Sequence, residues 1–220
     1  MLRVVCLTAV MLHTGCAHHS HDMEMHHRFE RAEDWVARFE DPARDAWQKP
    51  DEVLSKLQLP PNATVADLGA ATGYFSVRLA KALPQGRVFG VDIESSMVDY
   101  LTQRAKTEGL TNLTAVLGAE DDAKLPEAVD LIVVVDTYHH IGERSAYFKR
   151  LTSSLKAGGR LVIIDFTMSS SMGPPRDAKV SPETVRAELE AAGYTLQASH
   201  DFLPEQFMLV FQPTAMYQPR

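Results

Sequence analysis

A glycine-rich turn with an acidic residue on each side is suited to holding a nucleoside. Asp67 ends an apolar run in the segment VADLGAATGYFS and is followed by Gly69, Ala71 and Gly73. Asp92 ends the next apolar run, nineteen positions beyond the last of these glycines. Glycine lets the backbone approach a ligand closely, and the N–H groups at a helix start can bind its polar groups. Because a carboxylate on the neighbouring strand can accept hydrogen bonds from a ribose diol, the spacing predicts a nucleoside site.

The acid before the turn distinguishes between two classes of nucleoside. In a dinucleotide-binding enzyme the turn cradles a pyrophosphate, which a carboxylate just before the first glycine would repel. The turn here reads DxGxAxG and lacks the GxGxxG spacing of that class. Asp67 suits a ligand that carries an amino group and a positively charged sulfonium. A dinucleotide-dependent oxidoreductase is kept as an alternative.

Two adjacent histidines form the second group of residues that could do chemistry. The segment VDLIVVVDTYHHI contains His139 and His140 just after an apolar run. A neutral imidazole can take a proton from an oxygen, nitrogen or carbon nucleophile, so either histidine is a candidate general base. Asp136 or Tyr138 is then the residue expected to orient it. The alternative is that both histidines only form hydrogen bonds that hold the loop.

These residues need a scaffold that brings the ends of several strands together. From Thr64 onward, apolar β-rich runs alternate with amphipathic helices, which is the pattern of parallel βαβ units. We predict strands at 64–68, 87–92, 113–117, 129–136 and 160–166, then a hairpin of strands at 195–202 and 206–211. Helices are predicted at 74–83, 95–108, 144–155 and after Ser181, and three short helices precede the first strand. The predicted fold is α/β: a doubly wound, mostly parallel sheet of seven strands with an antiparallel last strand.

The order of these motifs resembles the class I S-adenosylmethionine-dependent methyltransferases. In that family an acid followed by G-x-G-x-G precedes the first helix, and Ala71 stands here for the middle glycine. The later segments GAEDDAKLP, VDLIVVVDTYHHI and LKAGGRLVIIDF agree with the family in order and spacing, so the resemblance covers residues 50–211. It is closest to the small-molecule branch typified by ubiquinone/menaquinone-type methyltransferases.

The resemblance implies S-adenosylmethionine as the cofactor and an unidentified small molecule as the methyl acceptor. Glu120 and Asp121 fall where the family places an acid against the adenine amino group, and Ile93 follows the ribose-binding acid. Tyr74 is an aromatic residue that can stabilise a sulfonium. The implied reaction is an in-line attack on the sulfonium methyl, in which the protein contributes positioning and exclusion of water.

The resemblance also assigns a place to the N-terminal helices, which in this fold commonly cover the cofactor as a lid. Arg44 and Trp47 lie on these helices, although plain packing is an equal interpretation of the tryptophan. The segment 169–175 is a candidate wall of the acceptor site, with a surface connection as the alternative. The net charge of -7 describes an acidic protein that would repel a phosphate backbone, so we expect no nucleic-acid partner.

The N-terminus resembles a bacterial export signal. Arg3 precedes an apolar run that leads to LHTGC, a sequence similar to a lipobox in which Cys16 would be lipidated. His13 departs from the pattern, because an aliphatic residue is usual there. We predict a signal at 1–16, a His- and Met-rich tether at 17–28, and a methyltransferase domain with its lid helices at 29–220.

This organisation predicts an exported, periplasmic lipoprotein held at the membrane through Cys16. The alternatives are an ordinary cleaved signal, or a misassigned start that would leave the protein in the cytoplasm. A tether rich in histidine and methionine can bind copper or zinc, but a flexible connection is the favoured interpretation. Export also supports a third functional reading, because S-adenosylmethionine is made in the cytoplasm: an exported binding module that keeps the nucleoside fold without turnover.

Overall fold

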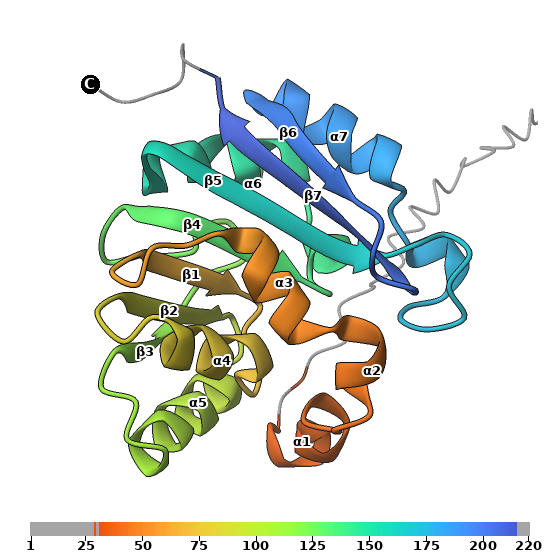
Figure 1. Ribbon diagram of the computed structural model, residues 1–220. Helices are drawn as coiled ribbons and strands as arrows, with labels where there is room; N and C mark the ends of the chain where they lie inside the picture. The colour runs from red at the N-terminus through yellow and green to blue at the C-terminus, as the bar shows by residue number, and fades with distance from the viewer. Residues whose placement is uncertain (1–28, 30, 215–220) are drawn as a thin grey trace, which may run out of the picture.

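The computed structural model describes residue 29 and residues 31–214 of the chain, and shows one sheet of seven strands (Figure 1). The strand order is β3-β2-β1-β4-β5-β7-β6. The strands are β1 (Thr64–Leu68), β2 (Arg87–Asp92), β3 (Leu113–Leu117), β4 (Val129–Val135), β5 (Leu155–Phe166), β6 (Tyr194–His200) and β7 (Gln206–Pro213). The predicted signal, the tether and Cys16 lie outside the described residues.

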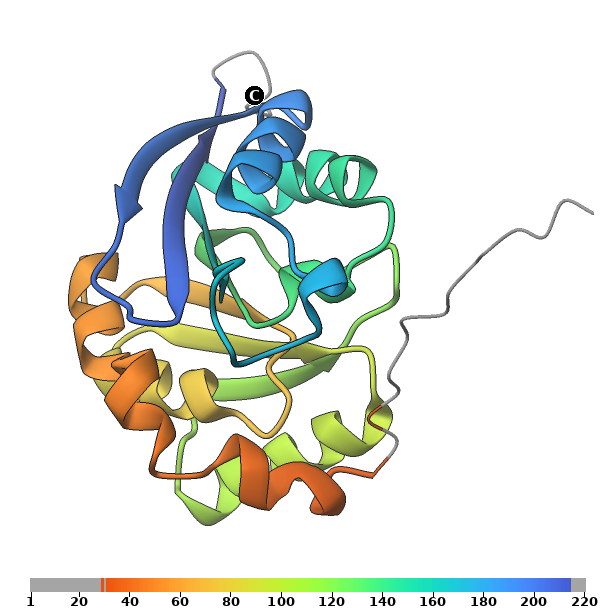
Figure 2. The ribbon, with the colours of Figure 1, turned by 90° about the vertical axis from the view of Figure 1, so that its right-hand side faces the viewer.

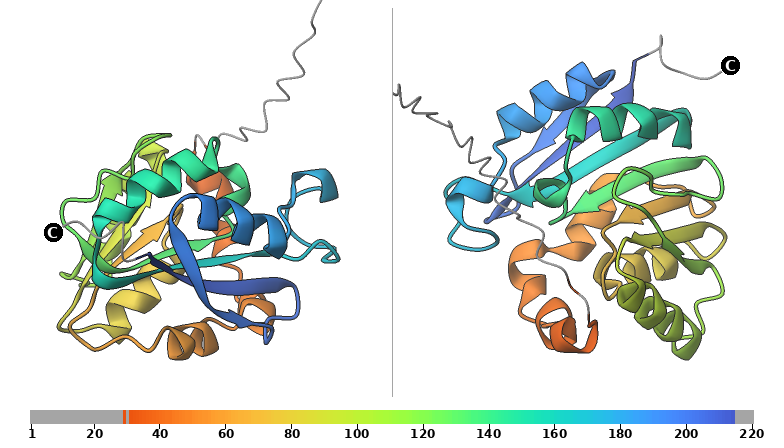
Figure 3. Two further views of the ribbon diagram at one scale, coloured as in Figure 1. Left: turned by 90° about the horizontal axis from the view of Figure 1, so that it is seen from above. Right: turned by 180° about the vertical axis from the view of Figure 1, so that it is seen from behind.

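Helices cover both faces of this sheet (Figure 3). The α-helices are α1 (Glu33–Phe39), α2 (Arg44–Gln48), α3 (Pro50–Leu57), α4 (Tyr74–Ala82), α5 (Ser95–Thr107), α6 (Arg144–Leu151) and α7 (Pro182–Ala191). One apolar core joins the sheet to α3, α4 and α5, and a second joins its other face to α6 and α7. In the described part of the chain, no helix is both long and apolar enough to cross a membrane.

The predicted sheet is confirmed, including its one antiparallel strand. β1 pairs in parallel with β2 and β4, and β7 runs antiparallel to both β5 and β6. The central strands are apolar on both faces because helices bury both sides, as expected for a doubly wound sheet. The strand order reverses between β1 and β4, and this switch point is where ligands bind at the carboxyl ends of such sheets.

The predicted helix at 144–155 is wrong at its end. α6 stops at Leu151, a short 3-10 turn follows at Thr152–Ser154, and Leu155 already belongs to β5. β5 therefore begins before the pair of glycines that was expected to precede it. An irregularity in the β4–β5 pairing absorbs the extra residues, because Val129 pairs with Leu155 and Leu131 pairs with Arg160. Leu155 fitted the helical spacing because its side chain is buried. It is buried as the first residue of a strand, however, and not as part of the helix.

The N-terminal helices end up beside the carboxyl ends of the strands (Figure 2). Pro50 begins α3, as predicted, and the left-handed backbone of Lys49 (φ 42°) turns the chain between α2 and α3. α3 packs Val53 and Leu57 into the core under the sheet. This anchoring holds α1 and α2 beside the carboxyl ends of β1 and β4.

Candidate active site

The glycine-rich turn leads from β1 into α4 with three residues in the left-handed region. Gly69, Ala71 and Gly73 have φ angles of 75°, 46° and 95°. The backbone N–H of Gly69 donates to the carbonyl of Val91 at 2.8 Å. A Cβ on Gly69 would lie 2.1 Å from the hydroxyl oxygen of Thr137, so no side chain fits there. The turn is thus packed directly against the loop after β4.

Ala71 adopts a left-handed backbone conformation that favours glycine, at the cost of placing a methyl group in that region. Its N–H donates to Oδ2 of Asp92 at 2.9 Å, and the N–H of Glu94 donates to Oδ1 at 3.0 Å. Burial raises the pKa of Asp92, and these backbone N–H groups oppose the rise. The carboxylate is held at the tip of β2 with lone pairs left for a ribose diol.

Asp67 lies beneath the turn. The residue is 3% exposed, and the hydroxyl of Ser76 donates to its Oδ2 at 2.6 Å. Burial raises the pKa of Asp67 to about 6, against the lowering effect of the Ser76 hydrogen bond. This carboxylate therefore anchors the start of α4 and acts on a ligand through its charge, since its hydrogen bond is to Ser76 within the protein.

An apolar edge flanks Asp92 and fits an adenine ring. Ile93 is 51% exposed and Leu117 is 48% exposed, which is unusual for large apolar side chains in this molecule. Both lie at the tips of neighbouring strands, because Asp92 pairs with Leu117 in the β2–β3 register. Glu120 and Asp121 follow in the next loop and are exposed. The sequence predicted Ile93 and the two acids in this region but missed Leu117, whose exposure has no sequence signal.

The structure gives Tyr74 partners other than the predicted sulfonium. The guanidinium carbons of Arg44 and Arg78 lie 4.0 and 3.9 Å from the centre of its ring. Its hydroxyl donates to Oδ1 of Asp45, and burial raises its pKa. A ligand cation would therefore have to displace an arginine from this ring, so Tyr74 ties α2 to α4 in the structure described.

His139 forms a buried pair with Asp165 at the tips of β4 and β5. Its Nδ1 lies 2.9 Å from both carboxylate oxygens, and its backbone N–H donates to Oδ2 at 3.2 Å. The two side chains are only 4% and 3% exposed. Because an ionised carboxylate can only accept, this contact favours the neutral tautomer in which Nδ1 carries the proton and Nε2 keeps a lone pair. His140 is adjacent, with the two rings 4.2 Å apart.

His139 has an orienting partner other than Asp136 and Tyr138, the two residues predicted to orient a histidine here. The Tyr138 hydroxyl donates to Glu188 at 2.6 Å, and Asp136 accepts hydrogen bonds from other elements. Asp165 takes the orienting position because β5 ends level with the turn that follows β4. The sequence contained one signal for this residue, since an acid at the end of a predicted strand faces the ligand edge.

Asp136 is the centre of a buried polar network that joins α2 to the sheet. The Gln48 amide donates to its Oδ2 at 2.9 Å, Gln206 donates to its Oδ1, and Arg44 lies 3.5 Å from Oδ2. Burial raises the pKa of Asp136 to about 6, while the charge of Arg44 opposes the rise. Its φ of 54° turns the chain out of β4, one residue earlier than predicted. Nothing in the sequence indicated either glutamine.

The residue that follows α1 contacts the turn directly, while the role of these helices as a lid stays a prediction. Glu40, just after α1, accepts a hydrogen bond from the Thr72 hydroxyl at 2.6 Å and pairs with Arg104 of α5 at 2.6 Å. Trp47 packs against Phe166 at the end of β5, with ring centres 5.8 Å apart. This contact supports the packing interpretation of the tryptophan.

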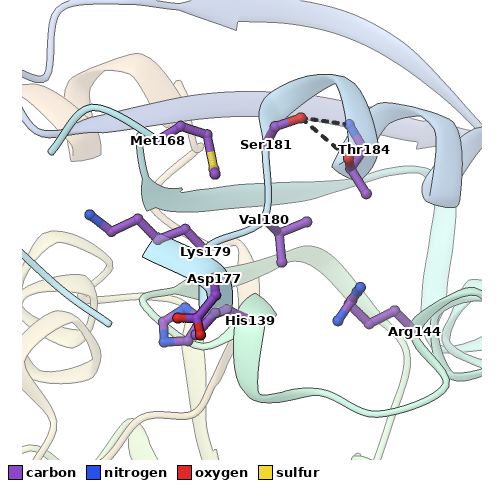
Figure 4. Close-up of a pocket in the computed structure, with 9 residues that line it drawn as sticks. His139, Arg144, Met168, Asp177, Lys179, Val180, Ser181 and Thr184 are labelled. Carbon is purple, nitrogen blue, oxygen red and sulfur yellow. Dashed lines mark hydrogen bonds between the residues drawn. The ribbon is translucent and has the colours of Figure 1, made fainter. Parts of the chain in front are cut away.

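A pocket of about 380 Å³ opens beside His139 (Figure 4). Its other walls come from α6, from Met168 and from the segment that leads into α7. The lining residues labelled in Figure 4 include Arg144, Met168, Lys179, Val180 and Thr184. Most of the lining follows Arg176, so the predicted wall at 169–175 is displaced toward α7.

Comparison with known proteins identifies the class of this arrangement. A family model described as a methyltransferase domain matches residues 59–209, which span β1 to β7 and all of the tips described above. The chain belongs to the methyltransferase domain family. This membership argues against a dinucleotide-dependent oxidoreductase.

Individual relatives agree with the family. A ubiquinone/menaquinone biosynthesis C-methyltransferase from Geotalea daltonii is 26% identical over 118 residues, which are 52% of this chain and 50% of that protein. A malonyl-[acyl-carrier protein] O-methyltransferase from Methylococcus capsulatus is 32% identical over 108 residues, covering 49% and 38%. The chain thus spans half or less of the length of these relatives.

A solved structure matches more of the methyltransferase domain. It is described as a SAM-dependent methyltransferase from Aquifex aeolicus, with 26% identity and a TM-score of 0.76 over 81% of this chain and 96% of that one. The expected cofactor, S-adenosylmethionine, is confirmed at the level of this family. The roles of individual site residues stay predictions.

Proposed function

We propose that the protein transfers a methyl group from S-adenosylmethionine to a small-molecule acceptor. The observation that carries the proposal is the contact between Gly69 and Thr137. It supports a nucleoside site at the tips of β1 and β2, next to the loop that carries His139. A cofactor site and a candidate base therefore meet at the switch point of the sheet.

Three groups of residues fit the cofactor. Asp92 has the position and free lone pairs to accept hydrogen bonds from the ribose, and Ile93 with Leu117 offers an apolar edge to the adenine. Asp67 supplies negative charge beneath the turn, which favours a cationic ligand. S-adenosylmethionine supplies an electrophilic methyl group on its sulfonium when bound.

The chain's own part in the reaction is to hold the acceptor and to move a proton. His139 has its Nε2 lone pair available to take a proton from an acceptor oxygen or nitrogen, because Asp165 holds the proton on Nδ1. The resulting imidazolium is stabilised by the same carboxylate. The closed helices α1 and α2 exclude water from the site.

A small acceptor agrees best with the shape and charge of the molecule. The pocket beside His139 holds about 380 Å³, which is the scale of a small-molecule site. The net charge of -7 disfavours a nucleic acid. Of the two relatives above, one is named for ubiquinone/menaquinone biosynthesis and the other for malonyl-[acyl-carrier protein], and neither is named for a nucleic acid.

Calorimetric titration with S-adenosylhomocysteine tests the cofactor site. We expect binding of this nucleoside and none of NAD. Asp92→Ala should weaken the affinity by about 10- to 100-fold, since it removes hydrogen bonds to an ionised acceptor worth roughly 1.5–3 kcal/mol. Asp99→Asn on the exposed face of α5 is the matched control and should bind normally. Equal affinity in the Asp92 variant would remove the nucleoside assignment.

A screen with labelled methyl groups tests turnover. Quinones, phenols and amines are the first acceptors to offer, because each presents an ionisable oxygen or nitrogen to a base. Binding of S-adenosylhomocysteine without transfer to any acceptor class would favour the binding-module alternative.

We also propose that the protein is exported and held at the membrane through Cys16. The support is the arrangement of Arg3, the apolar run and the lipobox-like LHTGC. Cell fractionation of the native protein should place it in the membrane fraction, and Cys16→Ser should release it. Recovery of both forms in the cytoplasm would contradict the proposal.

A further inference from the structure

A second pocket lies where the end of α3 meets the face formed by β5, β7 and β6. Its volume is about 310 Å³. Arg160 lines it from the middle of β5, whereas Asp165 lies near the end of the same strand. It shares no residue with the pocket beside His139. We call it the basic pocket; its lining consists of Lys56, Gln58, Arg160, Gln197, Ala198, His200, Val210 and Gln212.

Strand alternation and the length of α3 bring these residues together. Arg160 and Val162 lie on the same face of β5, and Val162 packs in the core beneath α3. Val162 pairs with Val210 of β7, and Val210 pairs with Ala198 of β6. α3 ends at Leu57, so beyond that point this face of the sheet carries polar side chains in place of a helix contact.

The β6–β7 pairing is irregular at this position. The register shifts between Leu196 and Ala198, which leaves Gln197 as an extra residue at the rim of the basic pocket. The Gln197 amide donates to the carbonyl of Thr195 at 3.2 Å, and the Gln212 amide donates to the carbonyl of Gly158 at 3.2 Å. Two of the three glutamines are therefore held in place by the backbone.

The charge of the basic pocket differs from that of the whole molecule. Its lining contains two cations, a histidine and three amides, and no carboxylate. Among the described residues, neither Lys56 nor Arg160 forms an ion pair, while Arg44, Arg104 and Arg144 are each paired with an acid. Arg160 donates to the carbonyl of Leu57, which fixes the guanidinium and leaves its charge uncompensated.

We propose that the basic pocket binds an oxyanion, a phosphate group or a carboxylate, at a site separate from the methyl-transfer site. A fixed guanidinium, an ammonium and amide N–H groups are the donors that recognise such oxygens. A concave site lined by one sign of charge also focuses the field, so that an anion is drawn to it on an otherwise acidic protein. The anion is either a free small molecule or the headgroup of an anionic lipid, which has the same chemistry.

Titration with inorganic phosphate, followed by backbone amide chemical shifts, tests the site. The protein is saturated with S-adenosylhomocysteine to keep phosphate out of the cofactor cleft. We expect saturable shifts at the end of α3 and in the facing parts of β6 and β7. The absence of shifts there at tens of millimolar phosphate, together with no vesicle binding in the assay below, overturns the proposal.

Changes of single side chains separate a built site from general attraction. Lys56→Gln and His200→Gln should each weaken phosphate binding by roughly two- to fivefold. Lys106→Gln on exposed α5 is the matched control and should leave the affinity unchanged. Equal weakening in the control would show a nonspecific charge effect and overturn the site. Unchanged affinity for S-adenosylhomocysteine in all three variants shows that they fold and separates this result from the test of methyl transfer.

Vesicle flotation distinguishes the two sources of the anion. Vesicles of phosphatidylglycerol and of phosphatidylcholine are compared, with the same variants. Binding to phosphatidylglycerol that falls in Lys56→Gln and His200→Gln, but not in Lys106→Gln, assigns the site to a lipid headgroup. Saturable phosphate shifts without such vesicle binding assign it to a free anion.

Discussion

His139 depends on a single neighbour for its proposed chemistry. Asp165 is almost fully buried and bonds to Nδ1 of the imidazole and to the backbone N–H groups of His139 and Phe166. The two backbone bonds fix the carboxylate, and the carboxylate in turn fixes the tautomer. Asp165 is therefore a positioning residue, because it acts on an acceptor through His139.

Asp165→Asn should change the histidine tautomer and reduce turnover. An asparagine can donate to Nδ1, which favours the tautomer with its proton on Nε2 and removes the free lone pair. We expect kcat to fall on the order of 100-fold or more once an acceptor is known. The ¹⁵N shifts of the imidazole report the tautomer without an acceptor. An unchanged Nδ1–H signal, or full turnover in the variant, would retire this role for Asp165.

The glycine-rich turn offers a matched pair of stability changes. Ala71 has a φ of 46°, so Ala71→Gly removes left-handed strain but loosens the unfolded chain. We expect a net gain in the free energy of unfolding of about 0.5–1 kcal/mol. Gly69→Ala should instead cost roughly 2 kcal/mol or more, because its Cβ would overlap the Thr137 side chain. Urea unfolding measures both, and effects of the same sign would contradict this account of the turn.

At the scale of elements, α2 is the helix that connects the lid to the sheet. It is only five residues long, so its own hydrogen bonds cannot hold it in place. Gln48 is fully buried and reaches both Asp136 and Gln206. Arg44 adds a guanidinium between Tyr74 and the Asp136 carboxylate. The position of α1 and α2 over the cofactor edge therefore depends on side-chain bonds to the tip of β4.

Gln48→Ala should release the lid without unfolding the sheet. The change leaves Asp136 with one amide donor fewer. The loss of a partner by a buried acceptor should destabilise the closed position of the lid by about 1–3 kcal/mol. Amide hydrogen exchange of α1 and α2 should become faster, while amides of β4 and β5 keep their protection. Gln103→Ala on exposed α5 is the control. Protection of α1 and α2 equal to that of the wild type would show that other contacts hold the lid.

For the whole molecule, two buried carboxyl groups set the direction of a pH effect on stability. Burial raises the pKa values of Asp67 and Asp136 to about 6, from a usual value of 3.8. Between these two values the folded protein binds protons that the unfolded chain has released. The contribution of both groups is therefore most favourable at low pH, and stability is lost as the pH rises from about 4 through 6.

We expect the ligand-free protein to be more stable at pH 5.5 than at pH 7.5. Each of the two carboxyls contributes roughly 0.5–1 kcal/mol to this difference. Asp67→Asn keeps an acceptor for Ser76 but cannot titrate, so it should reduce the stability gained at pH 5.5 by roughly 0.5–1 kcal/mol. Asp99→Asn should retain all of it. Urea midpoints at the two pH values provide the measurement, and an identical pH response in Asp67→Asn would contradict the raised pKa.

Periodicity in the sequence was sufficient for the scaffold. The alternation of β-rich runs and amphipathic helices predicted the seven strands and the antiparallel β7, because burial on both faces leaves a continuous apolar signal. The same signal failed at Leu155, where helix and strand both required a buried side chain. Local chemistry was also visible: the turn from Asp67 to Gly73 and the acid at Asp92 lie within neighbouring units of the chain.

What the sequence alone determined is therefore the fold, the family and its cofactor, since these depend on patterns among residues that are close along the chain or repeat with a fixed period. The tertiary structure decided which residues meet from distant segments. Asp165 replaced Asp136 as the partner of His139, Gln48 and Gln206 enclosed Asp136, and Arg160 came to lie near His200. Such pairs are set by strand order and by where helices end, and neither leaves a periodic pattern in the chain.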